Sequence, residues 1–281
     1  MRPTSLASSL LALLALTAAG AAAAQEPHCK QSAPRQLALD LAGVKAVVFD
    51  IGPHELKLDA TPGARAHVAG KACASSADAL AGLKLTQERE GDKLLVRAWR
   101  EGHFSGISFK ENYAYQTLTA SVPDSIPVQL KVGSGDASVS GAPVLSIDVG
   151  SGDVSAHRIR GLVAASVGSG DIELHDVGQL KVISIGSGSL EAHGVRGAVE
   201  VGSIGSGGFE VTGVEGDVQI GSVGSGGADV RDVKSSVGVD SIGSGDVDAR
   251  AVGGGLTVRS VGSGSIGHND VRGPIDTPKK K

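Results

Sequence analysis

Gly-Ser-Gly triplets recur through the second half of the chain at a nearly constant spacing. The eight triplets begin at Gly133, Gly150, Gly168, Gly186, Gly205, Gly224, Gly243 and Gly262. Successive triplets are 17, 18, 18, 19, 19, 19 and 19 residues apart. A fixed period of this length indicates stacked copies of one supersecondary unit, because each copy can bury its apolar face only against its neighbours. The repeat therefore predicts an elongated stack over residues 128–275.

Within one repeat, apolar and polar residues alternate in two short runs. The segment from Gly205 to Val223, GSGGFEVTGVEGDVQIGSV, is interrupted at Val214-Glu215-Gly216 and at the triplet itself. Alternation with a period of two is typical of half-buried strands, and glycine-containing breaks are typical of turns. Each repeat thus predicts two strands and two turns, which is one coil. The expected fold is all-β, a parallel β-solenoid with coils of roughly 18–19 residues.

Equivalent positions in successive repeats form columns of similar residues. One expected inward column contains Ile172, Leu190, Phe209, Ala228, Val247 and Ile266, and another contains Val177, Val195, Val214, Val233, Val252 and Val271. β-Branched side chains of like shape pack well in stacked strands. The triplet glycines are expected at the corners, where glycine permits a positive φ and a close approach of backbones.

The triplet itself resembles two ligand-binding loops in composition, and its context argues against both. A phosphate-binding loop is followed by a helix, whereas strands are expected after every triplet. A calcium-binding β-roll has a nine-residue repeat with an Asp in each turn. Here Asp follows the triplet in four coils only, and Ser189, Gly208, Gly227 and Ser265 occupy the other four positions. The triplet is therefore interpreted as a structural corner.

Two outward columns contain the side chains best able to bind a metal ion or a charged partner. The first is acidic and contains Glu173, Glu191, Glu210, Asp229 and Asp248. The second, two residues further along each strand, contains His157, His175, His193, Thr212, Arg231, Arg250 and Asn269. Residues i and i+2 share one face of a strand, so the two columns should lie side by side. The three histidines are candidate ligands for a zinc-like ion. The alternative is a solvated, charge-paired face, with the arginines as partners of the aspartates.

Residues 25–127 lack the triplet and are interpreted as divergent coils that form an N-terminal cap. Residues 44–59, 94–99 and 115–122 are strand candidates, and Gly52-Pro53-His54 takes the place of a triplet. Terminal units of a solenoid usually depart from the consensus, because one face has no neighbour. Residues 100–115 are expected to form a loop suited to a specific contact. Its His103 and Glu101 are interpreted as a solvent-facing pair rather than a catalytic dyad.

The N-terminal segment predicts export. Residues 1–24 combine Arg2, a short apolar run and Ala22-Ala23-Ala24, as in a secretory signal peptide, although a retained anchor helix is an alternative. We therefore expect a periplasmic or secreted protein with no transmembrane segment in the mature chain. In an oxidising compartment Cys29 and Cys73 are expected to form a disulfide, the alternatives being free thiols or half of a metal site. Residues 276–281 are expected to be a disordered, lysine-rich tail.

The phrase VPDSIPVQLKVGSGDASVSG (residues 122–141), followed by coils of the SVGSGDIELHDV type, resembles the bacterial putative-adhesin β-strand repeat proteins, which are related to the head GIN domain. The resemblance covers residues 37–274. It implies a parallel β-solenoid, and the family's adhesin label implies no particular residues for transfer to this chain.

Composition and motifs together favour a non-enzymatic, exported interaction scaffold, with adhesion or envelope association as its role. The net charge of −4 argues against nucleic acid as a partner, so an envelope or surface component, protein or polysaccharide, is expected. No cofactor is indicated. The alternatives are a metal-binding surface along the histidine column, a polysaccharide-active enzyme and a self-assembling scaffold. Minimal loops and the lack of a recognisable catalytic set argue against the enzyme.

Overall fold

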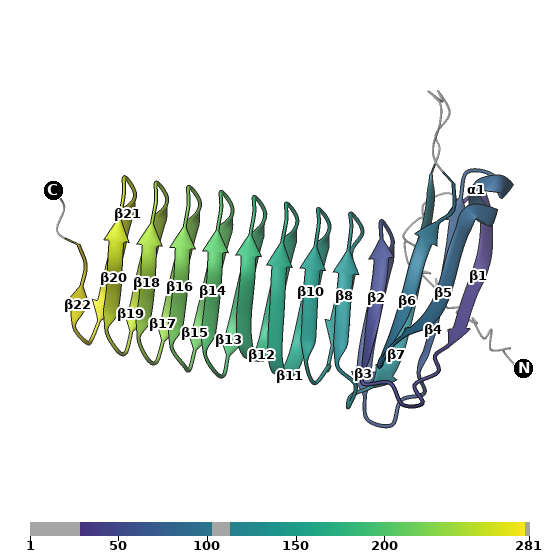
Figure 1. Ribbon diagram of the computed structural model, residues 1–281, viewed down its shortest axis with the longest axis horizontal. Helices are drawn as coiled ribbons and strands as arrows, with labels where there is room; N and C mark the ends of the chain where they lie inside the picture. Colours follow the sequence, from purple (N-terminus) through teal and green to yellow (C-terminus); the bar gives the residue numbers. More distant parts are fainter. Residues whose placement is uncertain (1–28, 103–112, 279–281) are drawn as a thin grey trace, which may run out of the picture.

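The computed structural model describes residues 29–102 and 113–278, and most of these residues lie in β-strands. The only helix in this part of the chain is α1 (Ala77–Gly82), which has six residues. Figure 1 shows the strands stacked along one long axis, with the helix at the N-terminal end of the stack and the C-terminus at the other end. The predicted parallel β-solenoid is confirmed.

Each coil contributes one strand to each of two facing ladders, and β11 and β12 belong to both because their two halves pair separately. The first ladder contains, in spatial order, β5 (Leu83–Glu90), β6 (Lys93–Arg100), β2 (Ala46–Gly52), β8 (Val128–Val132), β10 (Leu145–Val149), the second halves of β11 (Asp153–Val167) and β12 (Asp171–Ile185), β14 (Val199–Ile204), β16 (Val218–Val223), β18 (Val237–Ile242), β20 (Leu256–Val261) and β22 (Ile275–Asp276). The second ladder contains β1 (Gln31–Ala38), β4 (His67–Ala74), β7 (Ala114–Pro123), β3 (Glu55–Thr61), β9 (Ala137–Ser140), the first halves of β11 and β12, β13 (Ser189–Val195), β15 (Gly208–Val214), β17 (Gly227–Val233), β19 (Asp246–Val252) and β21 (Ser265–Val271).

Side chains that point between the two ladders form one continuous apolar core. In the valine column, every member from Val177 to Val252 is at most 1% exposed, and each lies opposite its equivalent in the next coil. In the other column the bulky Phe209 lies beside the small Ala228, which lets neighbouring layers fill the interior without large voids. The predicted inward columns are confirmed.

The triplet glycines are needed for close packing of the corners and not for unusual backbone angles. None of them has a φ in the left-handed range, so the expected positive φ at these corners is wrong. A Cβ placed on the second glycine of a triplet would lie 2.0 Å or less from a carbonyl oxygen of the preceding coil, for example Gly207 O in the case of Gly226. The same corners hydrogen-bond to each other, with Gly226 N donating to Gly205 O at 2.9 Å.

The opposite corner contains a column of left-handed residues that sequence reasoning missed. Eight consecutive coils have a residue with φ between 53° and 78° here, namely Gly141, Arg158, Asp176, Gly194, Gly213, Asp232, Ala251 and Asp270. Only three of the eight are glycines, so composition gives little signal. Asp tolerates this conformation better than most residues do, whereas Ala and Arg gain nothing from their side chains there.

Two register shifts between β11 and β12 cancel each other. Between β11 and β12 the pairing shifts by one residue after Ile159 and again after Ala165. The second shift restores the alignment, so that Val167 lies opposite Ile185. The inward columns therefore stay continuous across both shifts, with Val163 opposite Leu180 and Ala165 opposite Val182.

The N-terminal region combines one coil with antiparallel layers. β2 and β3 form a coil that is parallel to β8 and β9, and Gly133 N donates to Gly52 O, which confirms Gly52-Pro53-His54 as the equivalent of a triplet. The remaining strands differ from the expected divergent coils, because β1–β4, β4–β7 and β5–β6 pair antiparallel. A chain that folds back on itself can cover the end of the stack with short connections, which parallel coils cannot do.

The predicted disulfide between Cys29 and Cys73 is present and ties the start of the described chain to β4. The expected signal peptide, residues 103–112 of the expected loop with His103, and the terminal lysines of the expected tail lie outside the described residues. No helix in residues 29–102 and 113–278 is long and apolar enough to cross a membrane.

Candidate interaction surface

The outward face of the second ladder carries the two columns singled out in the sequence. Pairing between successive coils aligns Glu173, Glu191, Glu210, Asp229 and Asp248 in one line, and aligns His157, His175, His193, Thr212, Arg231 and Arg250 in the next. Neighbouring strands in a sheet are separated by about 4.8 Å, so each column is a regular row of like groups. The predicted side-by-side arrangement is confirmed.

The three histidines form a stack of parallel rings. The ring centroids of His157 and His175 are 4.9 Å apart, and those of His175 and His193 are 5.1 Å apart. His175 Nε2 hydrogen-bonds to Glu173 Oε1 at 2.7 Å, and His193 Nε2 makes the same bond to Glu191. The hydrogen bond from His175 holds the pKa of the Glu173 carboxyl below its ordinary value.

This stacking does not suit a shared metal ion. Imidazole lone pairs lie in the ring plane, so nearly parallel rings direct their nitrogens side by side and not toward a common point. A zinc ion needs nitrogens at about 2.0 Å in a tetrahedral arrangement. Among the described residues, no group of three or more His, Cys, Asp or Glu side chains is arranged to hold a metal ion. The histidine column therefore has the expected residues but lacks convergent ligand geometry.

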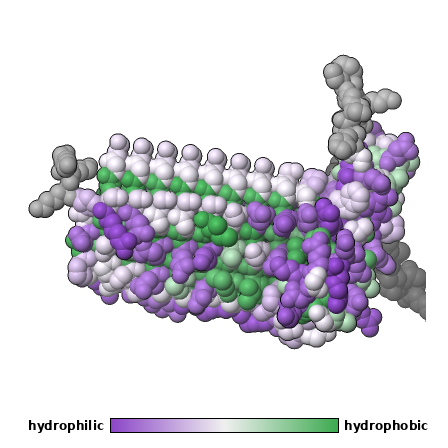
Figure 2. Space-filling view, in the orientation of Figure 1, coloured by the Kyte–Doolittle hydropathy of each residue, from purple (hydrophilic) through white to green (hydrophobic). Residues whose placement is uncertain are grey.

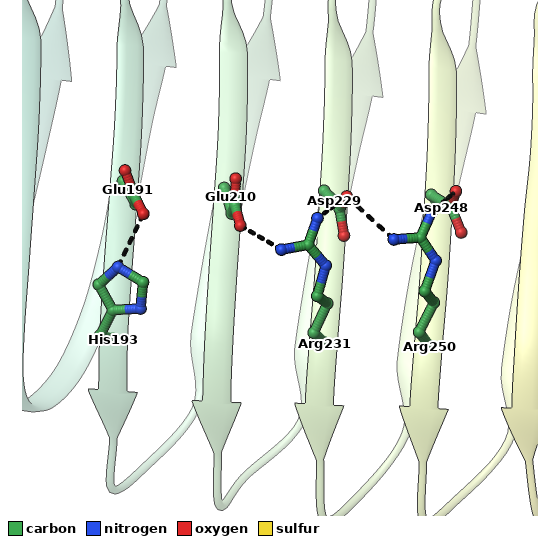
Figure 3. A network of polar contacts seen from close by, with 7 residues as sticks. All are labelled: Glu191, His193, Glu210, Asp229, Arg231, Asp248 and Arg250. Carbon is green, nitrogen blue, oxygen red and sulfur yellow. Dashed lines mark hydrogen bonds and ion pairs between the residues drawn. The ribbon is translucent and has the colours of Figure 1, made fainter.

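The arginines connect the acidic residues of three coils into one network, which Figure 3 shows. Arg231 bonds to Glu210 Oε1 and to Asp229 Oδ2, each at 2.5 Å. Arg250 pairs with Asp248 in its own coil and lies 3.7 Å from Asp229 Oδ2 in the preceding coil. The predicted pairing of the two arginines with the aspartates is confirmed. Such half-exposed pairs contribute little stability individually, and the network mainly fixes the positions of its charges.

A hollow of about 390 Å³ lies between this network and the triplet corner. It forms because Gly208 and Gly227 have no side chains at the position where other coils carry Asp or Ser. In those coils the Asp bridges to the next corner, as when Ser189 N donates to Asp171 Oδ1 at 3.0 Å. The two glycines can be seen in the sequence. The recess that they leave, which is lined by Glu191, Glu210 and other acids, can be seen only in the structure.

The row of triplet corners is a second regular feature of the surface. In Figure 2 the triplet corners form a pale, regular row along the upper edge, and hydrophilic patches, in purple, are scattered below it. Ile183 in β12 and Val144, which precedes β10, are exposed apolar residues, at 58% and 40%. Glu101 lies 3.4 Å from Lys84 Nζ, so it has a lysine partner within the cap strands.

Comparison with known proteins gives matches to solved structures alone. The chain is similar to the crystal structure of a putative adhesin from Parabacteroides merdae, with a TM-score of 0.50 and 12% identity over 85% of this chain and 97% of that one. A putative adhesin from Parabacteroides distasonis gives the same TM-score and coverage at 11% identity. No family model matches the sequence. No curated protein matches it either. At this identity the likeness supports the fold, in agreement with the resemblance seen in the repeats.

Proposed function

We propose that this protein is an exported, non-enzymatic β-solenoid that binds an envelope or surface component through the outward face of its second ladder. The observation that carries the proposal is the row of carboxylates, bonded to histidines in β12 and β13 and joined by arginines into one network from β15 to β19. Charges fixed at one strand spacing on a stiff backbone suit recognition, because little conformational entropy is lost when a partner binds.

The fold and the described residues favour binding over catalysis. A hydrolase needs a nucleophile or an acid–base pair whose pKa values are moved apart by their surroundings. On this face the carboxylates are bonded to histidines or arginines, as in the pair of Glu191 and His193. The structural neighbours, which are described as putative adhesins, agree with a scaffold. Periplasmic or secreted placement, from the signal peptide and the disulfide, belongs to the same proposal.

The test measures binding of the mature chain, residues 25–281, to washed envelope membranes and to purified envelope polysaccharide. The variant Glu210→Gln/Asp229→Asn/Asp248→Asn removes three charges of the network and is expected to weaken binding at least tenfold. A matched control, Asp148→Asn/Glu200→Gln/Asp240→Asn, removes three carboxylates from the first ladder and should bind normally. Equal binding by both variants, or no binding by the unmodified chain, would refute the proposal.

A further inference from the structure

The two ends of the solenoid are finished differently. At the N-terminal end, β6 covers the outer edge of β2 and β7 covers that of β3. At the C-terminal end, β22 covers β20 only at Leu256 and Thr257. The last strand of the second ladder, β21, pairs with β19 on one side, and no strand in residues 29–102 or 113–278 pairs with its other side. The terminal coil therefore presents an open edge.

This open edge carries the same backbone groups through which every earlier coil of the repeat bonds to the next one. At the preceding junction, Gly262 N donates to Ile242 O at 2.7 Å, and Ser263 N and Gly264 N donate to Gly243 O at 2.8 and 3.0 Å. The equivalent acceptors of the terminal coil are the carbonyls of Val261 and Gly262. No backbone N–H of the described chain bonds to them. Unpaired main-chain groups of this kind are a template for pairing with another segment.

The apolar columns are also incompletely covered at this end. Ile242, Val247 and Val252 are at most 2% exposed, whereas their equivalents Val261, Ile266 and Val271 are only partly buried. A hollow of about 740 Å³ lies beside the last triplet. Its lining includes Val261, Gly262, Gly264, Ile266, Thr277 and Pro278. Apolar side chains and unpaired backbone thus occur together on the same surface.

The corner geometry specifies what could cover this surface. In coil after coil, a Cβ on the second glycine of the triplet would meet a backbone carbonyl of the preceding coil at 1.7–2.0 Å. Real Cβ atoms do not approach a carbonyl oxygen so closely, and neither backbone can move without breaking the stack. A segment that continues the stack must therefore carry Gly-x-Gly at its corner, with apolar residues in the strands on both sides.

We propose that the terminal coil is a docking surface for an extended segment of another polypeptide that adds one more coil, with a Gly-x-Gly corner stacked on residues 262–264. Main-chain hydrogen bonds to β20 and β21 would supply affinity, as in other cases of strand addition, and the glycine corner would supply specificity. An intact second copy of this chain does not fit this description, because the N–H groups of its terminal corner already donate to Ile242 O and Gly243 O, and the N-terminal end of its stack is covered by β6 and β7.

A synthetic peptide with the sequence of residues 220–233, IGSVGSGGADVRDV, is the probe. It carries one triplet with the flanking strands and is labelled for fluorescence anisotropy. The unmodified peptide is expected to bind saturably, one per chain. A peptide with Gly226→Ala is expected to bind at least tenfold more weakly, because its Cβ would meet the carbonyl of Gly264. Absence of binding, or equal affinity of the two peptides, would overturn the proposal.

Variants of the protein locate the site. Ile266→Asp places a charge on the exposed end of the core and is expected to abolish peptide binding, while Ile183→Asp, on the side of the first ladder, should leave it unchanged. A concentration-dependent dimer that Ile266→Asp dissociates, seen by sedimentation, would place a second copy on the edge and overturn the assigned occupant. These outcomes are independent of envelope binding, because the acidic network lies on the side face and is intact in both variants.

Discussion

Single glycines in the corners have unequal roles, and the structure separates them. Gly226 and Gly227 are adjacent, and neither has a left-handed backbone. A Cβ on Gly226 would lie 2.0 Å from the carbonyl oxygen of Gly207, whereas one on Gly227 would have only Asp246 O within 4 Å, at 3.7 Å. The first glycine is required by the stack, and the second merely leaves a recess.

We expect Gly226→Ala to be strongly destabilising and Gly227→Ala to be tolerated. The clash in Gly226→Ala involves two backbones, so relief requires separation of the coils and a loss of more than about 3 kcal/mol in the free energy of unfolding. Gly227→Ala should be neutral or stabilising by up to about 1 kcal/mol, because alanine restricts the unfolded chain. Urea unfolding followed by circular dichroism measures both. Equal stability of the two variants would contradict the assignment of the corner.

The left-handed column predicts a substitution that increases stability. Ala251 has a φ of 54°, a conformation in which an L-residue with a Cβ is strained and glycine is not. Ala251→Gly is therefore expected to raise the free energy of unfolding by roughly 0.5–1 kcal/mol. The matched control is Ala249→Gly, a buried strand position in the same coil, which should lower stability. A decrease for Ala251→Gly would show that the strain is absent.

The junction between the first coil and the cap strands depends on a buried polar contact. His54 is 1% exposed and Gln116 is fully buried. Gln116 N donates to His54 Nδ1 at 3.3 Å, and the Gln116 amide donates to Lys84 O at 3.0 Å. One histidine and one glutamine thus link the turn between β2 and β3 to β7 and β5. Burial lowers the pKa of His54 from 6.5 to about 4, since the charged ring would lose its hydration.

This junction should weaken as the pH falls from 6.5 toward 4. In that range the unfolded chain binds a proton at His54 and the folded chain does not, so protonation favours unfolding. The contribution is fully present above pH 6.5, and its complete loss corresponds to about 3 kcal/mol. Urea unfolding across this range should show a shallower decline for His54→Asn, which keeps an acceptor and does not titrate. His67→Asn, at an exposed histidine, is the control, and an unchanged slope in His54→Asn would refute this account.

The molecule as a whole is modular, because each coil contacts only its neighbours. Stability in such a stack is approximately a sum over units and their interfaces, so a whole coil can be removed without loss of register. Removal of part of a coil would shift the register, and a shift in register turns inward side chains outward.

Deletion of residues 205–223, one coil of 19 residues, is expected to give a folded and shorter protein. Its length in small-angle scattering should decrease by about 4.8 Å, one strand spacing, and its β-type circular dichroism should persist. Deletion of residues 205–214, about half a coil, should yield an unfolded or aggregated chain. Equal folding of the two deletions would show that the coils are not the units of the stack.

The repeat region could be predicted in detail because each position is constrained many times. The valine column from Val177 to Val252 and the acidic column from Glu173 to Asp248 were both identifiable from their spacing alone. The N-terminal strands were less predictable, because each antiparallel pairing occurs once and has no repeat to support it. Of the candidate surface, the pairing of Arg231 with Asp229 was foreseeable, whereas the hydrogen bonds of the stacked histidines to Glu173 and Glu191 were not.

The Gly-Ser-Gly period by itself determined that this chain forms a parallel solenoid, since no other arrangement lets eight identical corners and their apolar columns coincide. The tertiary structure decided what the period leaves open. Only stacked backbones show that the second glycine is excluded from carrying a Cβ, because that distance is between coils and not along the chain. Only the stacked strands show that, among residues 29–102 and 113–278, β6 and β7 cover the first coil while β21 has an unpaired edge, since a repeat describes its neighbours and not where neighbours are missing.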